Sequence, residues 1–167
     1  MPIPTTHDAL IRRAAERYLP FDWRVLKAQL WQESRFAPDA RSPVGAEGIA
    51  QFMPPTWADV AEELEYPEVA TPDDPEWAVP AAAHYMGKLY GAWHWPRPEW
   101  DRICLALASY NAGLGNIVHA QAHADFASGY APIIAQLQKV THAHASETVG
   151  YVRRVLRFSI DLTTRGH

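Results

Sequence analysis

The sequence lacks the features that mark secreted, membrane-spanning and nucleic-acid-binding proteins. Cys104 is the single cysteine, so no disulfide can form within the chain, and its apolar neighbours indicate a buried, unreactive thiol. No stretch approaches the roughly 20 apolar residues that a membrane-spanning helix needs, and the N-terminal segment has no apolar core of an export signal. We therefore expect no membrane insertion, and no signal peptide is visible.

An excess of one charge is lacking as well. The net charge is −4 and the 15 lysines and arginines are scattered, which gives no support for a nucleic-acid-binding protein. Apolar residues make up 48% and charged residues 20% of the chain, as in ordinary folded proteins and unlike disordered ones. No internal repeat, low-complexity tract or linker interrupts the sequence. We therefore expect residues 1–167 to form a single domain.

The feature that is present is helical periodicity, with apolar residues at spacings of three and four in segments bounded by Asp, Pro or Gly. We expect helices over about residues 6–19, 22–36, 54–64, 75–93, 98–112, 116–126, 131–140 and 146–163. Pro80 should either move the start of the fourth helix to about Val79 or bend that helix. Residues 37–53 show no sustained period, so turns with at most a small hairpin are expected there. The pattern predicts an all-α or α-dominated fold of about seven or eight short helices.

Three separate stretches of the sequence together form a motif of defined order and spacing. The first, ESRFAPDARSPVGAEGIAQFMPPT, begins at Glu33, the second is ASYNAGLGN at 108–116, and the third is ETVGYV at 147–152. In their order and spacing they resemble the soluble (SLT-type) lytic transglycosylases of the lysozyme-like superfamily, over about residues 19–157. The positions of the first stretch that fit the family pattern are Glu33, Ser34, Phe36, Ser42, Gly45, Gly48, Gln51, Met53, Pro54 and Thr56.

The resemblance implies a lysozyme-like fold and an enzyme that acts on peptidoglycan glycan strands. Such an enzyme cleaves the β-1,4 bond between N-acetylmuramic acid and N-acetylglucosamine and leaves a 1,6-anhydro-muramic end. One glutamate, here Glu33, acts first as acid and then as base. We expect no cofactor and no metal, and a monomer. His119 and His123 stand one helical turn apart, as in a metal pair, but without a third ligand we interpret them as surface residues.

The position of Glu33 suits that chemistry. Cleavage of a glycosidic bond needs a proton for the leaving oxygen, and at neutral pH this requires a carboxyl group that stays protonated. Burial by neighbours such as Trp31 and Phe36, together with the helix C-terminus, would raise the pKa of Glu33 from about 4.3 toward 6 or more. Judged by its position alone, a helix end in solvent is the simpler interpretation of Glu33, and only the order and spacing of the three stretches favour catalysis.

The resemblance also implies a set of substrate-binding residues: Ser42, Gln51, Met53, Tyr110, Asn111, Glu147 and Tyr151. Hydroxyl and amide groups would hydrogen-bond the sugars and the Met53 thioether would form an apolar floor. Tyr110 and Asn111 would approach the N-acetyl group and the catalytic carboxyl, and Glu147 would be a buried acid of the last helix. Each has a structural alternative, such as a turn residue, a core residue or a first-turn helix acid, and the glycines of the motif serve backbone geometry.

Two further functions stay open at this point. Glu47 could bring a second carboxylate near Glu33 and activate water, which would make the protein a hydrolytic muramidase like goose-type lysozyme, although a solvated turn acid is the simpler interpretation. A non-catalytic wall-binding module is the alternative of another class, and the intact Glu33 argues against it. The chain as given fits a bacteriophage endolysin, which passes from host cytoplasm to cell wall through a membrane lesion, or a virion-associated enzyme, or a bacterial enzyme without its leader.

Overall fold

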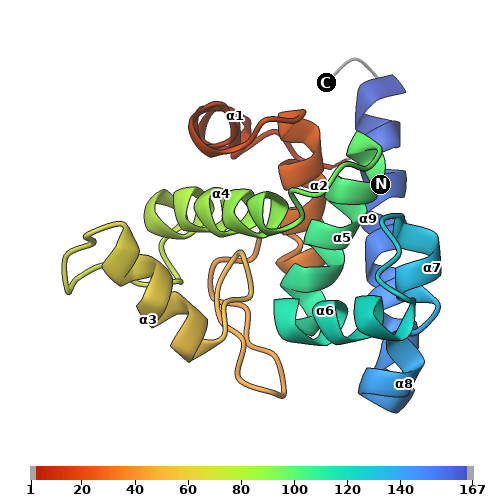
Figure 1. Cartoon of the computed structure of the whole chain (residues 1–167). Coiled ribbons are helices and arrows are strands. Elements are labelled where there is room, and N and C mark those ends of the chain that lie inside the picture. The colour runs from red at the N-terminus through yellow and green to blue at the C-terminus, as the bar shows by residue number, and fades with distance from the viewer. Residues whose placement is uncertain (1–2, 165–167) are drawn as a thin grey trace. The chain divides into compact units, whose positions relative to one another are not determined.

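Helices form nearly all the regular structure of residues 3–164, the part of the chain that the computed structural model describes (Figure 1). In chain order they are α1 (Asp8–Tyr18), α2 (Trp23–Ser34), α3 (Pro54–Glu63), α4 (Pro75–Ala92), α5 (Glu99–Ala112), α6 (Leu114–His123), α7 (Tyr130–Ile134), α8 (Leu137–Thr141), the 3₁₀-helix η1 (His142–His144) and α9 (Ala145–Thr164). Among these, α7 and α8 have only five residues each. No strand occurs within residues 3–164, where isolated antiparallel bridges join Glu47 to Arg41 and to Phe52. The all-α prediction with a small hairpin in 37–53 is confirmed.

Most predicted helix starts agree with the structure. The Asp22 carboxylate caps α2 by accepting a hydrogen bond from the amide of Arg24 at 2.8 Å, as its position before an apolar run indicates. Pro54 opens α3, where its missing amide hydrogen costs nothing because the first amides of a helix have no partner within it. The predicted helix over 131–140 divides instead into α7 and α8.

The structure excludes one of the two alternatives for Pro80, the later start of the helix, and a bend stays a prediction. The helix α4 does not start near Val79 but at Pro75, and Pro80 lies inside it. Asp74 supports this earlier start, because its carboxylate accepts a hydrogen bond from the amide of Glu76 at 3.0 Å. Pro80 removes one helical hydrogen bond close to the start of a long helix, and the remaining turns of α4 continue past it.

Two compact units divide the chain: unit 1 is Met1–Tyr85 with Val155–His167, and unit 2 is Met86–Arg154. Both α4 and α9 contribute residues to both units. The single domain expected from the sequence stays a prediction. None of the helices within residues 3–164 combines the length and the apolar character needed to cross a membrane.

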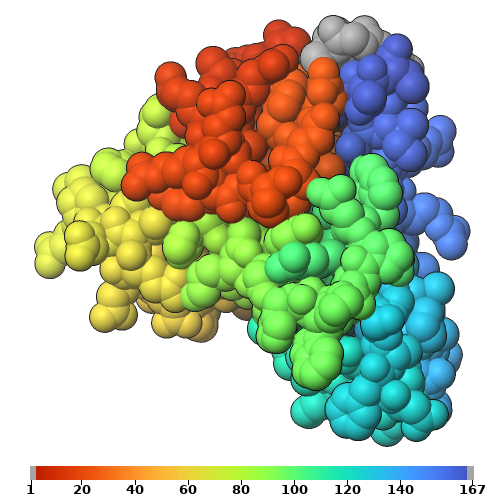
Figure 2. Space-filling view, turned by 45° about the horizontal axis from the view of Figure 1, so that its top comes forward, coloured from red at the N-terminus to blue at the C-terminus, as the bar shows by residue number. Residues whose placement is uncertain are grey.

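In unit 1, α1 and α2 pack against each other, and their red and orange side chains lie side by side in Figure 2. The core joins both helices to the 49–52 segment, α3 and the start of α4, and its largest members are Ile11, Leu26, Leu30, Trp31, Phe36, Ile49, Phe52 and Val60. Lys27 is fully buried in α2, and its Nζ lies 2.6 Å from Asp8 Oδ1 in the first turn of α1. The sequence pattern gave no sign of this buried ion pair.

In unit 2, α5 contacts α6 and α7, and α6 also contacts α8. The fully buried apolar side chains of these helices are Leu105, Leu107, Ile117, Ile133 and Leu137. Cys104 lies in the same interior with 6% of its surface exposed, and burial raises the pKa of its thiol to about 12. The prediction of a buried cysteine is confirmed, and a thiol that keeps its proton is a poor nucleophile.

Candidate active site

Glu33 is the last residue but one of α2, and it is half-buried while Leu30 and Trp31 before it are buried. The chain leaves the helix at once, because Arg35 and Phe36 both adopt left-handed backbone conformations, with φ of 59° and 65°. The helix therefore presents a carboxylate at its end rather than along its side, as the sequence predicts.

The two aromatic residues that flank Glu33 in the sequence, Trp31 and Phe36, contact each other. The rings of Trp31 and Phe36 meet edge to face, with centroids 5.3 Å apart, and both belong to the core of unit 1. Their shared role is to hold the end of α2 against that core. Desolvation of the Glu33 carboxyl by these two rings stays a prediction.

The segment 37–53 is tied to the end of α2 by Ser34. Its hydroxyl donates a hydrogen bond to the carbonyl oxygen of Ile49 at 2.8 Å, and Ile49 and Ala50 are fully buried. A loop anchored in this way has little freedom beside Glu33. Ser34 belongs to the motif, but sequence reasoning gave it no role, because its partner is a backbone atom that no side-chain pattern reveals.

Ser42 shapes the turn of this segment. Its amide donates to the carbonyl of Ala46 at 3.0 Å, and its hydroxyl oxygen accepts a hydrogen bond from the Ala46 amide at 2.9 Å. The reciprocal pair closes a turn in which Gly45 has φ of 91°. The structural alternative for Ser42, a turn residue, is therefore correct, and a contact with substrate stays a prediction in addition to it.

Gln51 holds the other end of the segment. Its backbone has φ of 49°, and its side-chain amide donates to the carbonyls of Gly48 at 2.9 Å and Ala40 at 3.3 Å. Gly48 allows a close approach of two backbones, because a Cβ atom at this position would overlap with the carbonyl oxygen of Pro72. The motif glycine thus serves backbone geometry, as expected.

Met53 is exposed at the start of α3, with 41% of its surface accessible. The alternative in which Met53 fills the core is wrong, because the side chain follows Phe52, which takes the buried position. An exposed thioether beside two prolines offers an apolar surface to a ligand.

Glu47, the candidate second carboxylate, has a cationic partner. Arg41 Nε lies 3.8 Å from Glu47 Oε1, and the same guanidinium donates to both carboxylate oxygens of Asp73, at 2.8 and 2.6 Å. Hydrogen bonding to Arg41 lowers the pKa of Asp73. Arg41 thus bridges the two acids and ties the turn that contains Glu47 to Asp73.

The other four predicted substrate-binding residues lie in unit 2. Tyr110 and Asn111 are half-buried near the end of α5. The Asn111 Oδ1 atom accepts a hydrogen bond from the hydroxyl of Thr148 at 2.8 Å, which fixes the orientation of the amide group, and a contact with substrate stays a prediction. Tyr151 is buried, with 3% of its surface exposed.

Glu147 is not the buried acid that the sequence analysis expected. Its side chain is 66% exposed, and its Oε2 atom lies 3.9 Å from the Nδ1 atom of His144, one turn earlier. The buried polar residue of this motif is Thr148, with 3% of its surface exposed. The inward face of α9 includes Thr148, Tyr151 and Val152, and that spacing of three and four places the residue before Thr148 on the outer face.

The histidines of α6 form no metal centre with other residues that the structure describes. His119 and His123 are both exposed, and residues 3–164 hold no group of three or more His, Cys, Asp or Glu side chains suited to a metal ion.

Comparisons with known proteins point to the same family as the sequence motif. Residues 9–131 match the Transglycosylase SLT domain. The membrane-bound lytic murein transglycosylase F of Shewanella loihica is 29% identical over 172 residues, which cover 93% of this chain and 34% of that protein.

Two solved structures share the fold. One is an inactive glutamate-to-glutamine mutant of the lytic transglycosylase Slt from Pseudomonas aeruginosa, with a TM-score of 0.78 and 26% identity over 98% of this chain and 25% of that one. The other is the 70-kDa soluble lytic transglycosylase of Escherichia coli, with a TM-score of 0.71 and 25% identity over 94% of this chain and 24% of that one. The chain thus spans about a third or less of the length of these relatives.

Proposed function

Because the chain belongs to the transglycosylase SLT domain family, we propose that it is a peptidoglycan lytic transglycosylase. It would cleave the β-1,4 bond between N-acetylmuramic acid and N-acetylglucosamine and leave a 1,6-anhydro-muramic end. The observation that carries the proposal is the place of Glu33, half-buried at the end of α2 beside a loop whose backbone Ser34 and Gln51 hold in place. The inactivity of a glutamate-to-glutamine mutant of the Pseudomonas aeruginosa relative supports it.

Glu33 would serve as both acid and base. The protonated carboxyl gives its proton to the oxygen that leaves with N-acetylglucosamine, as the bond from that oxygen to the anomeric carbon of the muramic residue breaks. The carboxylate then takes the proton of the muramic 6-hydroxyl, whose oxygen bonds to the same anomeric carbon. No water is consumed. One carboxylate suffices because the nucleophile belongs to the substrate and is already close.

Each of the three predicted substrate-binding residues in unit 1, Ser42, Gln51 and Met53, would contact the sugars through a different chemical group. The Ser42 hydroxyl accepts a hydrogen bond from Ala46 and can still donate its own proton to a sugar. Gln51 uses its NH₂ group on the loop, so its carbonyl oxygen is the group for a ligand. Met53 would support a sugar ring with its exposed thioether.

In unit 2, we propose that the NH₂ group of Asn111, oriented by Thr148, meets the N-acetyl group together with Tyr110. Tyr151, which is buried, would act through its hydroxyl, and the exposed Glu147 would contact polar groups at the rim. The protein would act at the cell wall as a monomer.

Transglycosylation is favoured over hydrolysis by the pairing of Glu47 with Arg41. Enzymes that invert by hydrolysis need a second carboxylate free to activate water at a defined distance from the acid. A carboxylate that is paired with an arginine in a turn contributes to the structure of that turn. Glu47 therefore fits a structural role better than that of a general base.

The experiment that tests the proposal is mass analysis of the fragments released from purified peptidoglycan. We expect anhydro-muropeptides, which are lighter by one water than the hydrolysis products. Glu33→Gln should release none, and Glu47→Gln should release the same anhydro products as the unaltered protein. Fragments with reducing ends would identify a muramidase instead, and binding without any release would identify a wall-binding module.

A further inference from the structure

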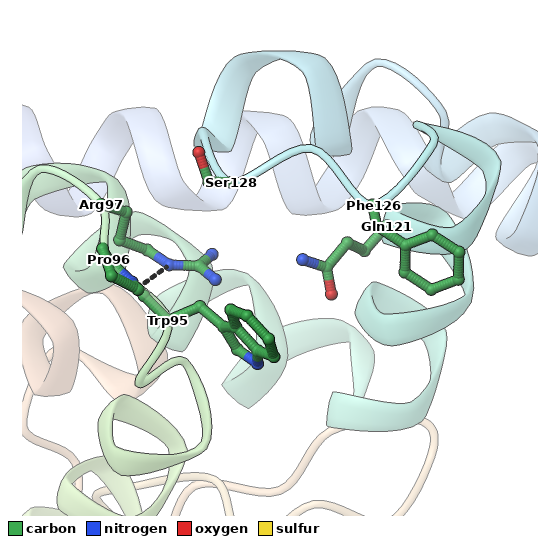
Figure 3. Close-up of a pocket in the computed structure, with 6 residues that line it drawn as sticks. All are labelled: Trp95, Pro96, Arg97, Gln121, Phe126 and Ser128. Atoms are coloured by element: carbon green, nitrogen blue, oxygen red, sulfur yellow. Dashed lines mark hydrogen bonds between the residues drawn. The ribbon is translucent and has the colours of Figure 1, made fainter.

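A cavity of about 320 Å³ lies within unit 2, and none of the candidate active-site residues lines it. Its walls come from the connection between α4 and α5 and from α6 with the connection that follows it (Figure 3): Trp95, Pro96, Arg97, Gln121, Phe126 and Ser128. This volume falls at the lower end of the range of small-molecule sites. The cavity therefore suits a short chain end rather than a long strand.

Among the described residues that line the cavity, Arg97 is the only charged one. Its Nε donates a hydrogen bond to the carbonyl of Trp95 at 3.1 Å, and its guanidinium carbon lies 5.2 Å from the centroid of the Trp93 ring. Figure 3 shows the guanidinium group pointing into the space between Trp95 and Ser128. The Nη1 and Nη2 atoms are covered from bulk water and have no hydrogen-bond partner within residues 3–164.

A covered cation without a partner is costly, because it has lost water and gained no counter-charge. Burial, followed by the nearby charge of Arg102, lowers the pKa of Arg97, and only Asp101 acts in the opposite direction. The guanidinium has two parallel donors that match the two oxygens of a carboxylate. With a single cation among its described lining residues, the site suits one negative charge better than a phosphate dianion.

Two of the other lining residues are large aromatic side chains. Trp95 and Phe126 are 68% and 75% exposed, which is unusual for rings of this size. Phe126 has φ of 58°, a left-handed conformation that costs energy for a residue other than glycine and is often retained at functional sites.

The strained loop is held in place by Gln121. The Phe126 amide donates to the carbonyl of Gln121, and the Gln121 side chain donates to the carbonyl of Ala127 at 3.0 Å. The carbonyl oxygen of the Gln121 side chain is left to accept a peptide N–H. The lining thus combines one carboxylate-binding group, one acceptor for an amide and two flat apolar walls.

We propose that this cavity binds the carboxylate end of a short peptide whose last residues are small and apolar. In peptidoglycan this chemistry belongs to the peptide stem that ends in D-alanine, so the assignment of the source rests on the proposed function. The terminal carboxylate pairs with the Arg97 guanidinium, a peptide N–H donates to Gln121, and the methyl groups lie against Trp95 and Phe126. The site holds a stem while the glycan lies elsewhere.

The test is calorimetric titration of the full chain with N-acetyl-D-alanyl-D-alanine and with the same dipeptide as its C-terminal amide. We expect the acid to bind at least about tenfold more tightly, because the amide cannot form the charge-assisted pair with Arg97. Equal affinity for the acid and the amide would overturn the proposal. Acetate that competes as strongly as the dipeptide would also overturn the proposal, because the cavity would then bind any small anion and not a peptide end.

Variants locate the site. Arg97→Gln should abolish the difference between acid and amide, Arg97→Lys should retain part of it because the charge stays, and Arg13→Gln, which removes an exposed charge of α1, should leave it unchanged. A circular dichroism melt of each variant shows whether it folds. An Arg97→Gln variant that melts normally and still prefers the acid would contradict the assignment.

A cleavage assay separates this inference from the proposed function. Glu33→Gln should still bind the dipeptide acid, because Glu33 lies outside the cavity. Arg97→Gln should slow release from stem-bearing peptidoglycan and not from glycan strands whose stems have been removed by an amidase. If the unaltered protein cleaves neither substrate, the proposed function fails while the dipeptide titration still decides the ligand of the cavity. Equal slowing on both substrates would contradict a role for the cavity in holding stems.

Discussion

Lys27 and Asp8 form an ion pair of 2.6 Å between the interior of α2 and the first turn of α1. The lysine side chain is fully buried and the aspartate side chain is 16% exposed. Because Lys27 lies on the helix that ends in Glu33, this pair fixes the helix that carries the candidate acid.

Loss of one partner of this pair should destabilise the protein strongly. Lys27→Ala leaves Asp8 without its counter-charge and opens a cavity, and we expect the free energy of unfolding to fall by about 3–5 kcal/mol. Urea unfolding followed by circular dichroism measures it. The double variant Asp8→Leu with Lys27→Met should recover most of the loss, because apolar residues of similar size can replace a buried pair. If the single and the double variants lost the same free energy of unfolding, the unpaired charge would not be the cause of the destabilisation.

Gly48→Ala should be much more harmful than Gly45→Ala. Both glycines have positive φ, at 75° and 91°, but a Cβ atom at Gly48 would overlap with Pro72, whereas the space around Gly45 is open. In the Gly45 variant only the backbone conformation is unfavourable, which should lower the free energy of unfolding by about 1–2 kcal/mol. The Gly48 variant must also displace the backbone of Pro72, so we expect a loss of about 3 kcal/mol or more. Denaturant midpoints of the two variants, which differ only in position, give the comparison, and similar midpoints would refute the close approach.

The local features of the fold were predictable because local chemistry produces them. An aspartate before an apolar run starts α2, prolines open α3, and positions rich in Gly and Pro between Phe36 and Met53 give turns with isolated bridges. The place of Glu33 at the end of a helix followed from the same signals.

Features that depend on partners far along the chain were not predictable. A lysine in a helix is ordinarily a surface residue, and only the packing of α1 against α2 reveals that Lys27 faces Asp8. Glu147 and Thr148 are adjacent, so a rotation of one position around α9 decides which of them is buried. The sequence analysis chose Glu147, but the inward face contains Thr148. The signal that could have found it is the spacing of three and four with Tyr151 and Val155.

The stability contributed by Asp73 should depend on pH in a defined direction. Its pKa in the folded protein is lowered, chiefly by the hydrogen bond from Arg41. The stabilisation is therefore present above the ordinary carboxyl pKa and is lost as the pH falls through the lower folded value. Because both side chains are well exposed, Asp73→Asn should lower the melting temperature by less than about 2 °C at neutral pH.

Melting curves at pH 7 and pH 3 check this dependence. The difference between Asp73→Asn and the unaltered protein should shrink at pH 3 and in high salt. Asp39→Asn is the matched control, since this acid also raises the pKa of Arg41 but only as the weakest of several charges. A difference that grows as the pH falls would contradict the pairing.

Thr148→Val should slow peptidoglycan cleavage without unfolding the protein. Valine keeps the shape of threonine but removes the hydroxyl that donates to Asn111 Oδ1 at 2.8 Å, so the amide that we propose to meet the N-acetyl group loses its fixed orientation. A lost hydrogen bond of about 1 kcal/mol corresponds to a rate lower by roughly five- to tenfold. The rate of anhydro-muropeptide release measures the effect, and a melting curve checks the fold. Thr148→Ser retains the donor and should keep most of the activity. A Ser variant as slow as the Val variant would mean that the methyl group, and not the hydrogen bond, positions Asn111.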